Sequence, residues 1–166
     1  MTHRAARLCA PLFAAAVTAA VTTSALIGTA GPAMAQDDLP PAVAARQHHM
    51  DLYGFNLALL GGMAKGEIDY DADAATGAAG NIAALAMLDQ SGYWPEGTSS
   101  DDIEGTRALP AIWENMDDFQ SHIDALAEAA TALEETAGDG VEAVRAGMGG
   151  IGKSCGGCHE DYRVSR

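Results

Sequence analysis

Basic residues are scarce in this sequence. Nine Lys and Arg residues stand against 23 Asp and Glu residues among 166 positions, and the formal net charge is −14. A surface this acidic repels phosphate backbones and anionic lipid headgroups. Nucleic acids and negatively charged membrane surfaces are therefore excluded as partners, and a partner protein is expected to offer a basic face.

Runs that alternate polar and apolar residues, as strands do, are nearly missing. Apolar residues instead recur at steps of three and four, which predicts helices. The four stretches with this spacing cover about 40–66, 71–90, 110–133 and 141–162. The predicted fold class is all-α, and the short connections after the first and third stretches favour antiparallel neighbours in a helix bundle.

Individual residues mark the ends and faces of these helices. Asp71 is predicted to cap the second helix, and Pro110 occupies the favoured first-turn position of the third. The third stretch keeps its apolar spacing without a break from Ile112 through Met116 to Leu133. One continuous amphipathic helix is therefore expected there.

Acidic residues are absent from positions 1–35. Arg4 and Arg7 precede a run rich in Ala, Val, Leu and Thr, and the run closes with Ala-Met-Ala at 33–35. This pattern predicts a secretory signal peptide at 1–35, cleaved to leave one mature domain, 36–166. A membrane anchor formed by the same apolar run is the alternative, although the Thr-rich composition argues against it. Since two of the nine basic residues leave with the peptide and all 23 acidic ones stay, the mature net charge is −16.

Only three cysteines are present, and Cys9 lies within the predicted signal peptide. Cys155 and Cys158 are so close that a disulfide between them would constrain the unfolded chain little. The five residues from Cys155 read C-G-G-C-H, the C-x-x-C-H pattern of covalent haem attachment. We therefore predict one covalently bound haem c per chain.

The spacing of this motif has a physical reason. Positions i and i+3 of a helix project from one face, so Cys155 and Cys158 can each add to one of two neighbouring vinyl groups of a porphyrin. His159 then places an imidazole beneath the iron as an axial ligand, and the two intervening glycines keep bulk away from the ring. Both cysteines also lie on the apolar stripe of the fourth helix.

The connection at 91–109 is long for a compact domain. Loops of this length without structure of their own tend to be functional. This one contains glycine, proline and aromatic residues. We predict that it is a crossover that covers one side of the cofactor pocket.

Two other uses of the cysteine pair remain open. A haem-free thiol redox protein of the thioredoxin type would place the pair at a helix start after a strand, whereas this pair lies near the end of the chain in a helical context. A zinc site would need two further ligands, which His48, His49 or His122 could supply, although none shows a paired metal-binding spacing. His48 and His122 are otherwise predicted to be solvated.

Three features resemble the class II c-type cytochromes, a group that includes cytochromes c′ and cytochromes c-556. They are the helix spacing, the segment Lys153–Arg163 (KSCGGCHEDYR), and the tripeptide AIW that ends at Trp113 and opens the third helix. The resemblance extends over about 40–163. It implies an antiparallel up-down-up-down four-helix bundle, with the haem inside and exposed at one edge.

The resemblance also implies roles for individual side chains. Arg46 matches an arginine on the first helix that can hold a haem propionate, and Arg163 matches the arginine beside the proximal histidine. An ordinary solvated arginine is the alternative at both positions. Trp113 and Trp94 are expected to pack near the porphyrin, with indole N–H groups that reach a propionate or a carbonyl.

Met50 matches the position that faces the distal side of the iron. In cytochromes c-556 a methionine there binds iron and gives a low-spin centre, whereas in cytochromes c′ the residue fills the pocket and leaves five-coordinate, high-spin iron. Both readings of Met50 stay open, because methionine at helical core spacing also serves in packing. His49 would be a distal ligand only if the helix were rotated, since it lies off the stripe formed by Arg46, Met50 and Tyr53.

These expectations describe a periplasmic monohaem cytochrome without substrate turnover, so the chain is not expected to be an enzyme. As an electron carrier it would pass single electrons between redox partner proteins, docking near the haem edge. As a gas-binding module it would hold NO or CO at an open iron site. The alanine- and glycine-rich face at 77–84 could pair two copies in a homodimer, or pack within one bundle.

Overall fold

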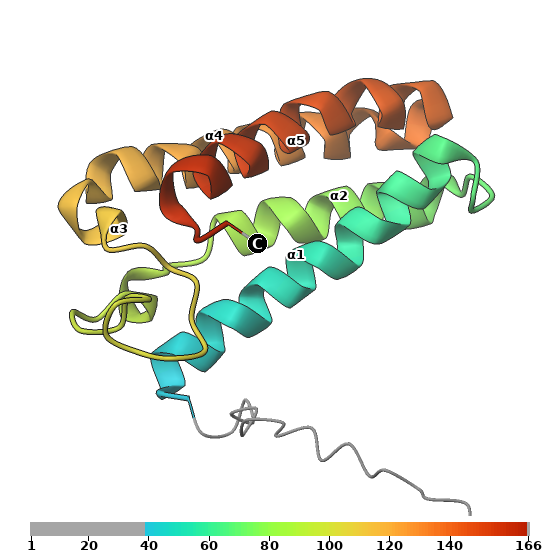
Figure 1. Cartoon of the computed structure of the whole chain (residues 1–166). Helices are drawn as coiled ribbons and strands as arrows, with labels where there is room; N and C mark the ends of the chain where they lie inside the picture. Colours follow the sequence, from blue (N-terminus) through green and yellow to red (C-terminus); the bar gives the residue numbers. More distant parts are fainter. Residues whose placement is uncertain (1–38, 166) are drawn as a thin grey trace, which may run out of the picture. The chain divides into compact units, whose positions relative to one another are not determined.

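The computed structural model describes residues 39–165, and the signal peptide predicted at 1–35 lies outside the described residues. The elements are α1 (Pro41–Lys65), α2 (Ala72–Ala86), η2 (Ser91–Tyr93), α3 (Ala111–Glu114), α4 (Met116–Thr136), η3 (Ala137–Asp139) and α5 (Val141–Tyr162). The four long helices pack in a ring, α1 with α2, α2 with α4, α4 with α5 and α5 with α1 (Figure 1). The predicted all-α bundle is confirmed. No helix in the described region is long and apolar enough to cross a bilayer.

The ends of the first two helices follow from local chemistry. Gly66 ends α1 with a left-handed φ of 76°, and its N–H donates to the carbonyl of Met63. Glycine adopts this φ without strain. The Asp71 carboxylate accepts a 2.7 Å hydrogen bond from the N–H of Ala74, as predicted for a helix cap. α2 ends at Ala86, earlier than the apolar spacing predicts.

The prediction of one continuous third helix is wrong, because Asn115 divides this stretch into α3 and α4. Asn115 has φ −135° and ψ 51°, outside the helical region. Asparagine favours such positions because its short polar side chain competes for backbone hydrogen bonds. As a consequence Met116, which the spacing places on the apolar face, is 37% exposed, whereas Ile112 and Phe119 are buried.

Small side chains let α2 pack closely against its neighbours. Ala75, Ala78, Ala79, Ala83 and Ala86 are all buried in one core cluster, together with Leu60, Met63, Ile82, Leu133, Val144 and Ile151 from the other helices and α2 itself. Much of the 77–84 face is therefore used within the bundle. Of the two uses predicted for it, packing inside one chain accounts for its buried alanines.

Gly147 brings α5 into close contact with α4. A Cβ atom added at Gly147 would lie 2.6 Å from Cδ1 of Leu133 and 3.1 Å from its Cβ. Leu133 is only 1% exposed, so it has little room to move aside. By contrast, a Cβ added at Gly149 on the same helix would meet no atom within 4 Å.

A smaller apolar cluster lies where α3, α4 and the end of α5 meet. Ile112, Phe119 and Tyr162 are its buried members. The crossover connection returns beside it, since Ala108 and Arg163 form an isolated antiparallel bridge. The connection is thus joined to the last residues of α5, which closes that end of the bundle.

The glycine contacts give a matched pair of variants. Gly147→Ala should lower the free energy of unfolding by about 1–3 kcal/mol, because the added methyl group forces α4 and α5 apart. Gly149→Ala should raise it by roughly 0.5–1 kcal/mol, because alanine is the better helix former and nothing obstructs it. Urea unfolding followed by circular dichroism measures both, and equal effects of the two substitutions would contradict the close approach inferred at Gly147.

Candidate functional site

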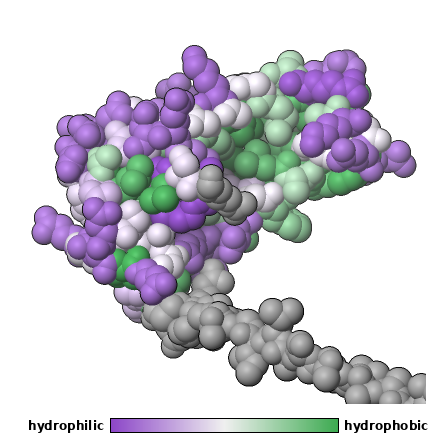
Figure 2. Space-filling model, in the orientation of Figure 1, coloured by the Kyte–Doolittle hydropathy of each residue, from purple (hydrophilic) through white to green (hydrophobic). Residues whose placement is uncertain are grey.

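A cavity of about 560 Å³ lies between α1, α4, α5 and the crossover connection. This volume is within the usual range for ligand and cofactor pockets, about 300–1,000 Å³. Six of the seven site residues predicted from sequence line it: Arg46, Met50, Cys155, Cys158, His159 and Arg163. On the face drawn in Figure 2, hydrophobic residues reach the surface between more hydrophilic margins.

The two cysteines come from consecutive turns of α5 and are both half-buried with free thiols. Burial raises the pKa of the Cys155 thiol. Burial and then the neighbouring Cys155 and Asp161 raise the pKa of Cys158 to about 11. Thiol redox proteins instead need a lowered thiol pKa, because the thiolate is the nucleophile. The haem-free thiol reading therefore receives no support from this site.

His159 lies one residue after Cys158 on the same cavity wall and is half-buried. Burial, and then the positive charges of Arg163 and Arg107, lower the pKa of its imidazole. A lowered pKa keeps the ring neutral at pH 7, and the neutral ring has the lone pair that a metal ligand requires. The described residues hold no group of three or more His, Cys, Asp or Glu side chains suited to a metal ion, so the zinc reading lacks a ligand set.

Arg46 is 4% exposed, and its guanidinium holds the crossover connection. One terminal nitrogen donates to the carbonyl of Tyr93 at 3.1 Å and to Oγ1 of Thr98 at 3.0 Å. The other donates to the carbonyl of Thr98 and to Oγ1 of Thr106 at 2.9 Å. These four bonds use every N–H of the two terminal nitrogens, so only the Nε–H remains for a propionate.

Met50 lies on α1, whereas His159 lies on α5, so the two predicted axial positions belong to different walls of one cavity. Met50 is 43% exposed and is therefore not locked by packing. Gly54 follows it by one helical turn and also lines the cavity. A Cβ added at Gly54 would meet no atom within 4 Å, so the wall leaves open space beside Met50.

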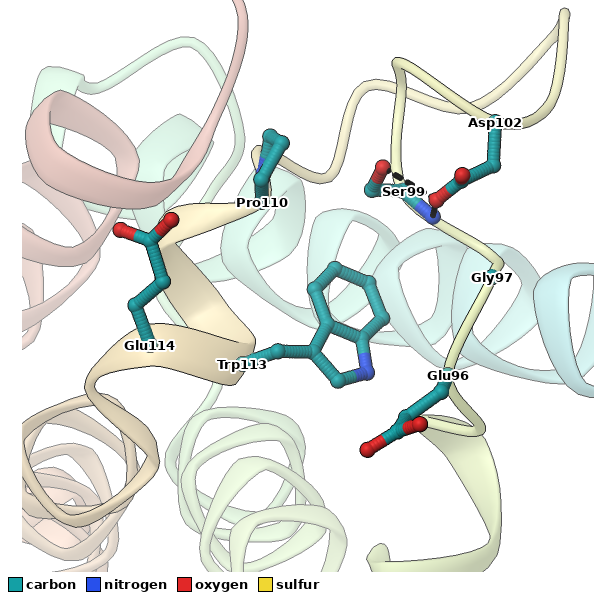
Figure 3. A pocket seen from close by; sticks show the side chains of 7 residues that line it. All are labelled: Glu96, Gly97, Ser99, Asp102, Pro110, Trp113 and Glu114. Atoms are coloured by element: carbon teal, nitrogen blue, oxygen red, sulfur yellow. Dashed lines mark hydrogen bonds between the residues drawn. The ribbon is translucent and has the colours of Figure 1, made fainter.

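The two tryptophans have different surroundings. Trp113 lines a separate hollow of about 250 Å³, where Figure 3 shows its indole between Pro110 and Glu96, with the Ser99–Asp102 hydrogen bond at the rim. Its Nε1–H donates to the carbonyl of Trp94 at 3.0 Å. Trp94 lines the large cavity instead, and its buried Nε1 has no hydrogen-bond partner in the described region.

His122 corrects one sequence prediction, because it lines the cavity and is not simply solvated. Its ring lies 6.0 Å from that of Tyr162. A Cβ added at Gly157, between the two cysteines, would lie 3.2 Å from Cε1 of His122, so this glycine permits the close approach of α4. The sequence contained a sign that His122 faces the bundle, because position 122 follows Phe119 by three residues and precedes Leu126 by four, which places all three on one side of a helix.

His49 is buried, but it does not line the cavity. Its ring instead contacts those of Tyr53 and Tyr93, with centroids 4.8 Å and 5.6 Å away. Burial lowers the pKa of His49. The position of the ring agrees with the prediction that His49 lies off the stripe, and it gives no support to a second histidine ligand.

The cavity as a whole fits an iron porphyrin. Its apolar wall, formed by Leu57, Ile112, Phe119, Ile123 and Leu126, suits the ring, and Arg107 and Arg163 supply positive charge for carboxylates. Cys155, Cys158 and His159 add two thiols and an imidazole on the same wall, which is the donor set that covalent attachment and axial ligation of a haem require.

Comparison with known proteins agrees with this geometry. The chain is 41% identical over 129 residues to a cytochrome c′ of Cereibacter sphaeroides, covering 78% of this chain and 87% of the relative. It is 40% identical over 134 residues to a cytochrome c-554 of the same organism, covering 80% and 88% of the two chains. A solved cytochrome c′ from Rhodobacter has 42% identity and a TM-score of 0.73, covering 75% of this chain and 96% of that one.

The family model described as Cytochrome C′ matches residues 41–163, which include all seven predicted site residues. The matched segment begins with the first residue of α1 and ends one residue after α5. It thus contains the whole bundle and the whole cavity wall. This chain belongs to the cytochrome c′ family of haem proteins.

Proposed function

We propose that the mature protein, residues 36–166, is a periplasmic monohaem electron carrier. One haem c is attached by thioether bonds to Cys155 and Cys158, with His159 as an axial ligand of the iron. The observation that carries this proposal is the placement of these three side chains on the wall of one largely apolar cavity of about 560 Å³. The bound haem would supply one-electron redox chemistry, so no substrate turnover is required of the chain.

The surrounding residues prepare the site for this role. Burial and the nearby arginines keep His159 neutral and ready to bind iron. The apolar side chains of the wall lower the local dielectric, which is one of the factors by which a protein sets the reduction potential of a bound haem. The mature net charge of −16 supports docking with a redox partner that presents a basic face, through contacts that weaken as salt is added.

A second candidate function is the binding of NO or CO. Met50 and the open space at Gly54 support it, because a thioether that is not held by packing leaves room for a diatomic ligand. A solved ferrous variant of cytochrome c′ from Alcaligenes xylosoxidans carries bound NO, and it is 25% identical to this chain with a TM-score of 0.64. We propose that Met50 lies beside the second axial position without a bond to iron.

The exposed apolar side chains of α1 support a homodimer. Leu52 is 51% exposed and Phe55 is 72% exposed, and they lie three residues apart on one side of α1. Burying such side chains in a subunit contact stabilises association by roughly 1.5–3 kcal/mol for each large residue. We therefore place the dimer contact on α1, because Ala78, Ala79 and Ala83 of the 77–84 face are buried inside the bundle.

The attachment chemistry predicts a mass. When the full chain is made in a bacterial host that assembles c-type cytochromes, the exported protein should have the mass of residues 36–166 plus one iron porphyrin. Haem should stay with the protein through acid-acetone extraction, since thioether bonds survive it. The double variant Cys155→Ala/Cys158→Ala should release it, whereas Ser154→Ala should not. A mature protein with only its amino-acid mass would refute the proposed function.

The proposal that Met50 makes no bond to iron predicts the spin state seen in the visible spectrum. We expect the ferric protein to show a high-spin visible spectrum, and Met50→Ala should keep it while binding CO several-fold faster in the ferrous form. Leu57→Ala, which enlarges the same cavity without removing a sulfur atom, is the control. A low-spin spectrum that becomes high-spin in Met50→Ala alone would instead make Met50 an iron ligand.

The dimer proposal predicts an effect of charge on α1. Phe55→Asp should convert the protein to monomers in analytical ultracentrifugation at micromolar concentration, because the carboxylate would have to be buried in the contact. Met87→Asp, at an exposed residue just after α2, is the matched control and should leave the mass unchanged. Dimers that survive Phe55→Asp would place the contact elsewhere.

A further inference from the structure

His122 brings an ionisable side chain to the cavity wall from α4. Its imidazole lines the cavity and the side chain is 23% exposed, so water can reach the ring. The imidazole also lies against the C-x-x-C-H segment of α5, since a Cβ added at Gly157 would lie 3.2 Å from its Cε1 and 3.5 Å from its Nδ1. The proposed function gives this residue no role.

The glycine at position 157 has a physical reason in this contact. The C-x-x-C-H pattern restricts only the two cysteines and the histidine, so position 157 could carry any side chain. A Cβ at Gly156 would meet no atom within 4 Å, whereas a Cβ at Gly157 would crowd the His122 ring. Glycine at 157 therefore lets the imidazole approach the turn between Cys155 and Cys158.

A carboxylate lies beside this ring. Asp118 precedes His122 by one helical turn on α4, and its Oδ2 is 3.7 Å from Nε2 of the imidazole. At this distance the two side chains attract each other when the imidazole carries a positive charge. The same carboxylate oxygen accepts a 2.6 Å hydrogen bond from the hydroxyl of Tyr162, which holds it in place.

The ionisable groups around His122 come from its own helix and from three other elements. They are Asp118 on α4, Cys158, His159, Asp161, Tyr162 and Arg163 on α5, Arg46, Asp51 and Tyr53 on α1, and Arg107 on the crossover connection. The hydrogen bond to the Asp118 carboxylate raises the pKa of Tyr162 to about 12, and burial raises the pKa of Tyr53, so both phenols keep their protons up to pH 9. The arginines stay charged. With haem attached, His159 binds iron, which leaves His122 as the described cavity-lining imidazole that can gain a proton.

A proton on this imidazole and an electron on the iron favour each other. Reduction lowers the positive charge of the iron by one unit, and protonation of His122 adds one unit on the wall of the same cavity. Charges separated by an apolar cavity interact more strongly than charges in bulk water. By linkage, each event favours the other by the same free energy.

We propose that His122 takes up a proton when the iron is reduced and releases it when the iron is oxidised, so that this protein carries a proton with each electron. The electron comes from a donor protein and converts Fe(III) to Fe(II). The proton comes from the solvent, and the one bond formed is the second N–H of the imidazole. Asp118 stabilises the resulting positive charge. This inference rests on the proposed function, because it requires the haem iron in the cavity.

The test is the midpoint potential of the haem protein, measured by spectroelectrochemistry from pH 4 to pH 9. In the unaltered protein the potential should fall as the pH rises across one window and stay level on both sides of it. One proton per electron limits the slope to about 59 mV for a tenfold change in proton concentration. His122→Gln should remove the window and leave the potential near its high-pH level, because the amide stays neutral.

Two charge variants on α4 form a matched pair. Asp118→Asn should move the window to lower pH by about 0.3 unit, a roughly twofold loss of proton affinity, which is the size expected for an ion pair one helical turn apart. Asp124→Asn removes the same charge two residues after His122, where the carboxylate accepts a hydrogen bond from Gln120 instead. This second variant should leave the window in place. Where His122→Gln does not fold, the smaller His122→Asn is measured in its place.

Each outcome has one meaning. A potential that is independent of pH in the unaltered protein would overturn the inference. A window that persists in His122→Gln would also overturn it, because another group, such as a haem carboxylate, would then take up the proton. Equal shifts in Asp118→Asn and Asp124→Asn would refute the part assigned to Asp118. Failure of the proposed function looks different, because the protein would then retain no haem after acid-acetone extraction and have no midpoint potential to measure.

Discussion

The arrangement of this protein depends on one geometric constraint, which is that Cys155, Cys158 and His159 must face the same space from little more than one turn of α5. A helix that presents two thiols and an imidazole to one side cannot also fill that side with apolar packing. The bundle meets this requirement by packing tightly through the alanines of α2 at one end and opening a cavity at the other.

The crossover connection covers the open end of the bundle, and the buried guanidinium of Arg46 holds it there. The guanidinium of Arg46 joins α1 to the crossover connection at three places along its length. A buried cation is costly unless its donors are satisfied, and here carbonyl and hydroxyl oxygens together with the faces of two tryptophans satisfy it. The connection is therefore part of the site, held by the same helix that supplies Met50.

Spacing and local chemistry predict the helices and most of the cavity wall. The cap at Asp71 is visible in the sequence because the carboxylate acts on its own neighbours. The break at Asn115 is not, since the apolar spacing continues across it and the helix propensity of asparagine, although weak, does not exclude it from a helix interior. Similarly, sequence identifies Trp94 and Trp113 as a pair, but which indole reaches the cavity depends on the path of a long loop. His122 was missed because its burial arises from the contact with Gly157 on another helix.

The bridge between Ala108 and Arg163 ties the crossover connection to the residue directly after α5. Both residues line the cavity, and Arg163 follows His159 by four positions. A displacement of the end of α5 would therefore move the cover of the cavity and the imidazole wall together, which couples access to the cavity with the position of His159.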